Sequence, residues 1–121
     1  MKKILIVEDE ADIVETIKFS LEASGYNCSV AFDGMEAIQK VKQDSPDLII
    51  LDIMLPKMHG YKVCRLLKFD SRYKNIPIVM LTARAQKEDV NTGKETGADE
   101  YMTKPFEMED LIKLIEKYLE R

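Results

Sequence analysis

Acidic residues stand at the ends of two apolar runs in this chain. Glu8 and Asp9 come directly after residues 3–7, and Asp52 comes directly after residues 48–51. If the two runs are neighbouring strands, the three carboxylates crowd together and raise one another's pKa values unless a cation joins them. A few hard oxygen ligands open to solvent favour Mg²⁺, which keeps several waters, whereas Ca²⁺ needs more ligands than the sequence offers nearby. The pattern predicts a small divalent-cation site.

A hydroxyl and an ammonium stand at the ends of two further predicted strands. A carboxylate such as Asp52 can accept a phosphoryl group as a nucleophile, while Thr82 and Lys104 can hold phosphoryl oxygens. Each residue alone has a plainer explanation. Asp9 could cap a helix, Thr82 could be a strand-forming residue, and Lys104 could be a solvated loop charge. Their shared placement at strand ends favours a joint function in phosphoryl transfer.

Five strands must position these residues. Three runs, residues 3–7, 48–51 and 76–81, are apolar almost throughout, as expected of parallel strands covered on both faces. Residues 26–30 and 99–103 carry more polar types and are expected at the edges of the sheet. Strands alternating with helices predict an α/β fold, a flavodoxin-like (βα)5 three-layer sandwich whose parallel five-stranded sheet has the order 2-1-3-4-5. Ligands bind such sheets between strands one and three, where the acidic residues stand.

Helices are predicted between the strands, over about residues 11–24, 33–43, a stretch beginning at Gly60, about 86–96, and a last stretch after Phe106. Asp33 and Glu36 resemble a capping box. The third helix is expected to bury Val63, Cys64 and Leu67, and the last to bury a stripe formed by Met108, Leu111, Ile112, Ile115, Tyr118 and Leu119. Residues 86–96 should form the least stable helix, with the fastest amide exchange, because Gly93 costs about 1 kcal/mol relative to alanine.

Composition limits the function classes. The 121 residues suffice for one domain, and the net charge of −4 disfavours direct binding to nucleic acid or to an anionic membrane. No apolar run is long enough for a membrane span or a signal peptide. Cys28 and Cys64 form no metal or redox spacing, so we expect reduced packing residues in a cytoplasmic protein.

Five motifs in this order resemble those of response-regulator receiver domains, the CheY-like domains of two-component phosphorelay systems. They are Val7–Glu10, Leu51–Pro56, Leu81–Ala83, Gly97–Tyr101 and Lys104–Phe106. The likeness runs from residue 2 to about residue 120. It implies that residues 1–121 form one receiver domain, with no output domain in this chain.

The resemblance also implies roles for the site residues. Asp52 would be the phosphoacceptor, taking a phosphoryl group from a sensor histidine kinase or a histidine phosphotransfer protein. Asp9 and Asp52 would ligate Mg²⁺, which Mn²⁺ could replace, together with the backbone carbonyl of Met54 and with Glu8 acting through water. Lys104 would bind a phosphoryl oxygen.

A conformational switch is implied as well. Thr82 would move toward the phosphoryl group, Tyr101 would turn inward behind it, and Ala83 would keep the site accessible. A cis Lys104–Pro105 bond would aim the lysine. The face formed by the fourth helix, fifth strand and fifth helix would then regulate an unidentified partner or output domain. The chain would be a signalling phosphoacceptor that promotes its own phosphorylation and slow dephosphorylation, not an enzyme acting on other substrates.

Some positions depart from the family pattern. Many relatives carry a polar side chain where this chain has Met54, and a thioether cannot orient water, so we expect slow loss of phosphate; a loop methionine without a kinetic role is the alternative. Lys94 and Leu114 stand where dimerising receivers typically carry an apolar residue and an arginine, which disfavours the family's active-state homodimer. Before phosphorylation we expect a monomer. Leu114 is expected off the core stripe, either extending an apolar patch toward Tyr118 or simply exposed. Phe19 is expected to be exposed on the side that resembles the kinase-docking surface, and His59 on a solvated loop.

Other functions fit the same fold. A receiver-like interaction module with little phosphotransfer should lack one of Asp9, Asp52 or Lys104, and all are present. A flavin-binding redox protein should have a phosphate loop rich in Ser, Thr and Gly after the first strand, where this chain has Glu-Asp-Glu. A haloacid-dehalogenase-type phosphatase needs a second aspartate at position 54.

Overall fold

The central layer of the protein is one parallel sheet. In the computed structural model, which describes residues 2–56, 58–83 and 97–120, the strand order is β2-β1-β3-β4-β5. The strands are β1 (Lys3–Val7), β2 (Asn27–Ala31), β3 (Leu48–Asp52), β4 (Ile78–Ala83) and β5 (Glu100–Lys104). This confirms the predicted flavodoxin-like order. β1 and β3 are neighbours, with Val7 opposite Leu51.

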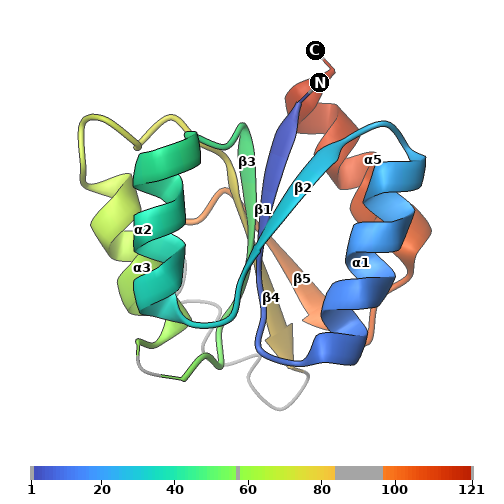
Figure 1. The fold of residues 1–121 in the computed structure, drawn as a ribbon, viewed down its shortest axis with the longest axis horizontal. Helices are drawn as coiled ribbons and strands as arrows, with labels where there is room; N and C mark the ends of the chain where they lie inside the picture. The colour runs from blue at the N-terminus through green and yellow to red at the C-terminus, as the bar shows by residue number, and fades with distance from the viewer. Residues whose placement is uncertain (1, 57, 84–96, 121) are drawn as a thin grey trace.

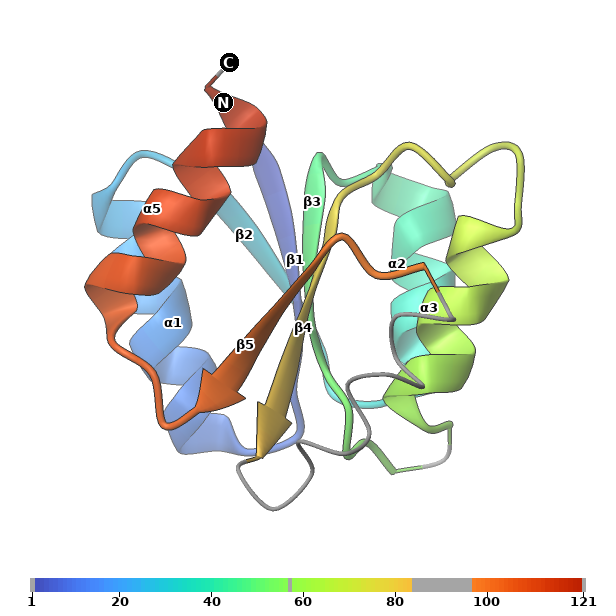
Figure 2. The ribbon, with the colours of Figure 1, turned by 180° about the vertical axis from the view of Figure 1, so that it is seen from behind.

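Helices cover both faces of the sheet. α1 (Ala11–Ala23) and α5 (Met108–Leu119) lie on one face, and α2 (Gly34–Asp44) and α3 (Gly60–Lys68) lie side by side on the other. Figure 2 shows the same layers from behind, with β5 at the edge of the sheet between the two helical layers. The helix predicted over about residues 86–96, including Gly93, lies outside the described residues, so its low stability stays a prediction.

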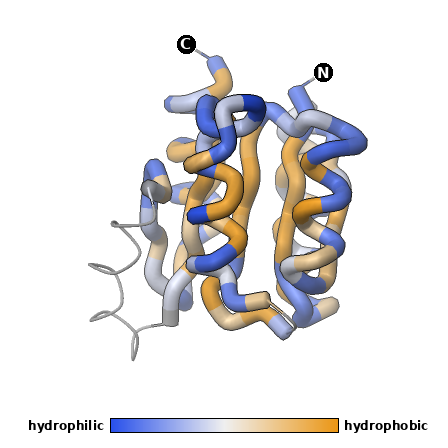
Figure 3. Tube along the Cα trace, turned by 90° about the vertical axis from the view of Figure 1, so that its left-hand side faces the viewer, coloured by the Kyte–Doolittle hydropathy of each residue, from blue (hydrophilic) through white to orange (hydrophobic). Residues whose placement is uncertain are grey.

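Each face of the sheet has its own hydrophobic core, because successive residues of a strand point to opposite faces. Leu5, Val7, Ile49 and Leu51 face α2 and α3, while their chain neighbours face α1 and α5. Figure 3 shows the strands as hydrophobic segments inside more hydrophilic helices. Burying each such side chain contributes roughly 1.5–3 kcal/mol, so the sheet is a firm base for groups at its edge.

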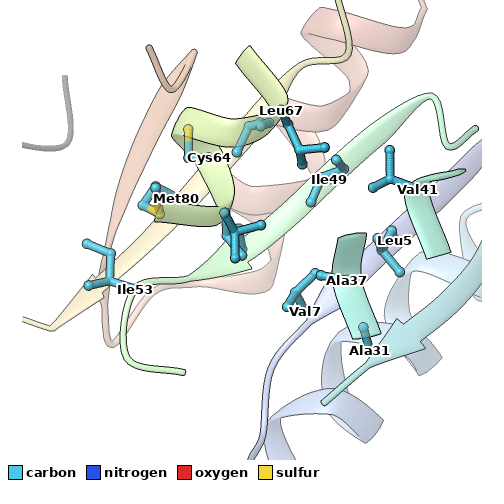
Figure 4. Packing of buried hydrophobic residues seen from close by; sticks show 13 residues of the cluster. Leu5, Val7, Ala31, Ala37, Val41, Ile49, Ile53, Cys64, Leu67 and Met80 are labelled. Atoms are coloured by element: carbon cyan, nitrogen blue, oxygen red, sulfur yellow. The ribbon is translucent and has the colours of Figure 1, made fainter. Parts of the chain in front are cut away.

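The core beneath α3 agrees with the predicted face of that helix. Val63 and Cys64 are fully buried and Leu67 nearly so. Figure 4 shows side chains of α2 and α3 meeting those of the strands, with Cys64 near Met80 and Val41 near Leu5. In α5, Leu111 and Ile115 are buried. The other stripe residues, Met108, Ile112, Tyr118 and Leu119, are half-buried against the same core.

Several local predictions are refined by the structure. The Asp33 side chain caps α2 by accepting from the Glu36 N–H at 2.8 Å, and the Glu36 carboxylate in return accepts from the Phe32 N–H at 2.9 Å. β4 begins at Ile78, later than predicted, because Pro77 has no N–H to donate to a neighbouring strand. The Lys104–Pro105 bond is cis, as expected.

Four further expectations concern single side chains. Phe19 is exposed, as predicted. Leu114 was expected at the surface, and this was wrong: it is half-buried against the core between α1 and α5. His59 is exposed, but it also caps α3, because its Nδ1 accepts from the Tyr61 N–H at 3.2 Å. Among the described residues Cys28 and Cys64 form no disulfide; Cys28 is half-buried and Cys64 is buried.

Candidate functional site

The carboxyl ends of β1 and β3 bring three acidic side chains together. Glu8 follows β1 and Asp52 ends β3, and Asp9 comes next in the loop that leads into α1. One carboxylate oxygen from each lies within 4.8 Å of the other two. Glu8 is fully buried, Asp52 is 5% exposed, and Asp9 is open to solvent. The predicted convergence of these residues is therefore present.

Asp9 does not serve as a helix cap. The residue at the N-cap position of α1 is Glu10, and its side chain makes no capping hydrogen bond. The Glu10 N–H instead points back to the site, donating to the Glu8 carboxylate at 3.3 Å. The plainer explanation offered for Asp9 is thereby removed.

Lys104 reaches into the site from the end of β5, two strands away from Asp52. Its ammonium lies 3.1 Å from the Asp52 carboxylate and 3.3 Å from the Glu8 carboxylate. Burial disfavours the ammonium, but the charges and hydrogen bonds of Asp52 and Glu8 outweigh it and raise the pKa of Lys104. Lys104 is therefore a charged, positioned member of the site and not a solvated loop lysine.

Glu8 is held in an environment that opposes its ionisation. Burial raises the pKa of Glu8 to about 8, the adjacent Asp52 carboxylate adds to the rise, and Lys104 opposes it. The Lys104 ammonium, which lies closer to Asp52 than to Glu8, offsets this rise only in part.

Asp52 is oriented by backbone contacts as well as by Lys104. One oxygen accepts from the Met54 N–H at 3.1 Å and the other faces Lys104. Behind it, Gly60 packs against the strand end, and its N–H donates to the Ile53 carbonyl at 2.9 Å. A Cβ at position 60 would lie 2.8 Å from the Ile53 Cα, so no larger residue fits without a shift. Sequence reasoning took Gly60 only as the start of a helix and missed this contact.

The proposed switch residues lie on β4, which is next to β3, and on β5, the strand beyond it. Thr82 is fully buried, one residue beyond the partner of Asp52 on β4. Tyr101 on β5 packs against the core beneath α3, and burial raises its pKa to about 12. Within the described part of the chain, neither hydroxyl has a hydrogen-bond partner. Ala83 is the last residue of β4, two residues beyond the predicted end of that strand.

The donor set fits a hard divalent cation. It offers carboxylate oxygens from Glu8, Asp9 and Asp52, with one ligand open to water, which suits an ion that keeps part of its hydration shell. Met54 lies two residues after Asp52 and is 56% exposed. The ligand role expected for the Met54 carbonyl stays a prediction.

These features define a class of protein: a doubly wound parallel α/β domain with an acidic metal pocket at its switch point. The family model described as response regulator receiver domain matches residues 4–116. The chain belongs to this family, whose members partner with histidine kinases. The match favours the predicted receiver over a flavin-binding protein of the same fold.

Individual relatives agree with the family assignment. The chain is 45% identical over 120 residues to the alkaline phosphatase synthesis transcriptional regulatory protein PhoP of Bacillus subtilis, covering 99% of this chain and 49% of PhoP. It thus spans about half the length of that curated relative.

Solved structures agree as well. A putative response regulator from Chloroflexus aurantiacus is 34% identical, with a TM-score of 0.93 covering 99% of this chain and 98% of that one. The receiver domain of the sensor histidine kinase PA1611 from Pseudomonas aeruginosa is 28% identical, with a TM-score of 0.90 and the same coverage. That structure has a magnesium ion coordinated in its active-site cleft.

Among the described residues, no helix has both the length and the apolar character needed to cross a membrane.

Proposed function

We propose that residues 1–121 act as one receiver unit, in which Asp52 accepts a phosphoryl group from the phosphohistidine of a sensor histidine kinase or a histidine phosphotransfer protein. The observation that carries the proposal is the placement of Lys104, whose ammonium reaches across the sheet to the buried carboxylates of Asp52 and Glu8. A half-buried lysine aimed at a carboxylate beside two further acidic groups suits the transfer of an anionic group. Family membership supports the same conclusion.

In the proposed reaction, a carboxylate oxygen of Asp52 forms a bond to phosphorus while the bond from phosphorus to the donor imidazole nitrogen breaks. The donor imidazole, already protonated on its second ring nitrogen, leaves as the neutral ring, and Asp52 becomes an acyl phosphate. Lys104 holds a phosphoryl oxygen in place of its present contact with the free carboxylate. The backbone N–H of Met54 keeps the side chain of Asp52 oriented.

The expected metal ligands are Asp9, Asp52 and the Met54 carbonyl, with Glu8 acting through water. When bound, Mg²⁺, or Mn²⁺ in its place, neutralises charge on the carboxylates and on the transferring oxygens. The acidic cluster of this chain and the magnesium ion described for the PA1611 receiver domain support that assignment.

The proposed output is a rearrangement of the face that contains β5 and α5. The buried hydroxyls of Thr82 and Tyr101, which have no partners among the described residues, can gain hydrogen bonds when phosphoryl oxygens arrive. The partner that reads this change is an unidentified protein or output domain, and we expect the unphosphorylated protein to be a monomer.

A hollow beside Lys104 suits the incoming phosphodonor protein. It has a volume of about 480 Å³ and lies between α1 and the segment joining β5 to α5; its lining includes Asp12, Ile13, Lys104 and Phe106. The hollow opens next to Lys104, so a helix docked there would hold its histidine near Asp52. Phe19, farther along α1, would extend this surface.

The proposal is tested by incubating the protein with a small acyl-phosphate donor and Mg²⁺ and measuring intact mass. The wild type should gain one phosphate adduct, and the adduct should vanish on chelation of the metal. Asp52→Asn should gain none, whereas Asp70→Asn, at an aspartate paired with Arg72 and remote from the site, should behave as wild type. An adduct that persists in Asp52→Asn would refute the assignment.

A further inference from the structure

The outer side of α3 carries a stripe that the phosphoacceptor function does not use. Lys62, Arg65, Leu66 and Phe69 follow one another at helical spacing, on the side opposite the buried residues Val63, Cys64 and Leu67. Leu66 is 48% exposed and Phe69 is 72% exposed. A single exposed apolar side chain is ordinary, but two neighbouring ones flanked by cations are typical of a protein-binding surface.

Hollows flank this stripe. One has a volume of about 800 Å³ and is lined by Lys62, Arg65, Leu66, Phe69, Asp70 and Ser71. A smaller one, of about 180 Å³, lies toward α2 and includes Leu66 and Ile38 in its lining. Leu66 is thus a ridge with a depression on either side. Side chains of a docked helix could enter both depressions around it.

The charge of this surface is opposite to that of the molecule. Within residues 2–56, 58–83 and 97–120, no ion pair joins Lys62 or Arg65 to a carboxylate. The neighbouring Asp70 is already occupied, because Arg72 binds it through two nitrogens at 3.1 and 2.8 Å. Arg65 lies over the Phe69 ring, 5.9 Å from its centroid. Two cations therefore remain available beside apolar surface, on a chain whose net charge is −4.

We propose that this α3 surface, formed by Lys62, Arg65, Leu66 and Phe69, binds an acidic amphipathic helix of a partner protein. Large apolar side chains of that helix, three or four residues apart, cover Leu66 and Phe69. Its Glu or Asp residues on the flanks meet Lys62 and Arg65. The proposal goes beyond phosphotransfer, since the surface lies on the outside of the α2–α3 layer and shares no residue with the acidic site or with the hollow beside Lys104.

Two other occupants fit the surface less well. A second copy of the chain paired through the same surface would bring Lys62 and Arg65 against their own copies, and like charges oppose that contact. An anionic membrane would attract two cations weakly, and the acidic remainder of the chain would oppose its approach. An acidic helix satisfies the cations and covers the apolar residues at once.

The experiment uses two synthetic peptides of about four helical turns with the same apolar residues, one flanked by Glu and the other by Lys at the same positions. Each is titrated into the ¹⁵N-labelled full chain. The acidic peptide should give saturable amide shifts centred on α3, and the basic peptide should bind at least about tenfold more weakly. Affinity should fall as salt rises from about 0.01 M to about 1 M, because the Debye length shrinks from about 30 Å to about 3 Å.

Variants locate the binding site. Leu66→Ser and Phe69→Ser should each weaken binding about tenfold, and Arg65→Glu should do so to a similar extent. Met35→Ser and Lys113→Glu, at exposed positions on α2 and α5, are matched controls and should bind as wild type. All variants should still accept phosphate from an acyl-phosphate donor, which shows that they are folded and keeps this test separate from the test of the phosphoacceptor role.

Several outcomes would overturn the proposal. These are the absence of saturable shifts, equal affinity for both peptides, or losses confined to the control variants. Sedimentation that reveals self-association abolished by Leu66→Ser would assign the surface to a second copy of the chain. Binding to vesicles of anionic lipid, without binding to the acidic peptide, would assign it to a membrane.

Discussion

At the scale of single residues, the site balances three carboxylates against one ammonium. Lys104 compensates Asp52 at 3.1 Å, while Asp9 is hydrated and Glu8 is fully buried. Without a metal, the remaining repulsion is relieved at the lowest free-energy cost when the most buried carboxylate takes up a proton. That group is Glu8, whose pKa is raised to about 8.

This raised pKa makes folding stability depend on pH. Because the folded pKa of Glu8 lies above its unfolded value, the folded protein binds more protons between about pH 4.5 and pH 8, and Glu8 weakens folding as the pH rises through that window. One proton of difference corresponds to a slope of about 1.4 kcal/mol per pH unit. In chelator, the unfolding free energy of wild type should therefore fall more steeply across this range than that of Glu8→Gln. Urea denaturation at several pH values measures both slopes, and parallel curves would contradict the prediction.

Met54 should set the lifetime of the phosphorylated protein. Met54 is 56% exposed, and its thioether cannot align a water molecule for attack on the phosphoryl group. Met54→Asn supplies a donor and an acceptor at the same position and should speed phosphate loss severalfold. Decay of the phosphorylated species by intact mass measures the rate. Met35→Asn, at another exposed methionine, is the control, and an unchanged rate in Met54→Asn would assign Met54 no kinetic role.

At the scale of secondary-structure elements, the start of α3 packs closely against the end of β3. A Cβ at Gly60 would lie 2.8 Å from the Ile53 Cα and 3.0 Å from the Ile53 carbonyl oxygen. Gly60→Ala should therefore destabilise the fold by roughly 1–3 kcal/mol, although alanine is the better helix former, and should slow phosphorylation of Asp52.

The control for this prediction is Gly25→Ala at the far end of the sheet. Gly25 has φ +95 but nothing near its absent Cβ, so alanine there should cost about 1 kcal/mol of stability through backbone strain alone and leave phosphorylation unchanged. Equal phosphorylation rates in the two variants would mean that Gly60 does not position Asp52.

A second contact between elements connects α3 to the residue that precedes β5. The Lys68 ammonium lies 2.6 Å from the Asp99 carboxylate and also donates to the carbonyls of Lys74 and Ile76. Asp99 in turn accepts from the Ile78 N–H at 2.8 Å. Lys68→Met should cost roughly 2–3 kcal/mol by urea denaturation, because it leaves Asp99 and two carbonyls without this partner. Arg72→Met, which removes the exposed pair with Asp70, should cost little. Equal losses would show that burial does not matter here.

The contacts of Gly60 with Ile53 and of Lys68 with Asp99 show which features the sequence could and could not predict. Apolar runs and their end residues predict the sheet order and the meeting of Glu8, Asp9 and Asp52, because parallel strands end at one edge. The pattern cannot reveal contacts made by side chains that cross between elements. In the sequence, Lys68 resembles any other charged residue at a helix end. Leu114 lies off the expected stripe but is half-buried, because the second core extends between α1 and α5.

At the scale of the whole molecule, the site and the two chain ends lie at opposite ends of the sheet. The strand arrows in Figures 1 and 2 point away from the labelled ends of the chain and toward the acidic site. The buried apolar strands form the base of the site, and Asp9 lies on its solvent-exposed side. Charge repulsion at one edge thus acts on the stability of the entire fold, since the carboxylates come together only when the sheet is formed.

Mg²⁺ should consequently stabilise the folded protein as a whole. A ligand at a hundred times its Kd adds about 2.7 kcal/mol to the unfolding free energy, so the melting temperature should rise as Mg²⁺ is added. Asp9→Asn should reverse this pattern: it removes a negative charge that repels Asp52, so the variant should be more stable than wild type in chelator yet gain little from Mg²⁺. Glu22→Gln, at an exposed glutamate near the far end of α1, should respond to Mg²⁺ as wild type. Thermal unfolding with Mg²⁺ and with chelator measures all three proteins, and a full Mg²⁺ response in Asp9→Asn would exclude Asp9 as a ligand.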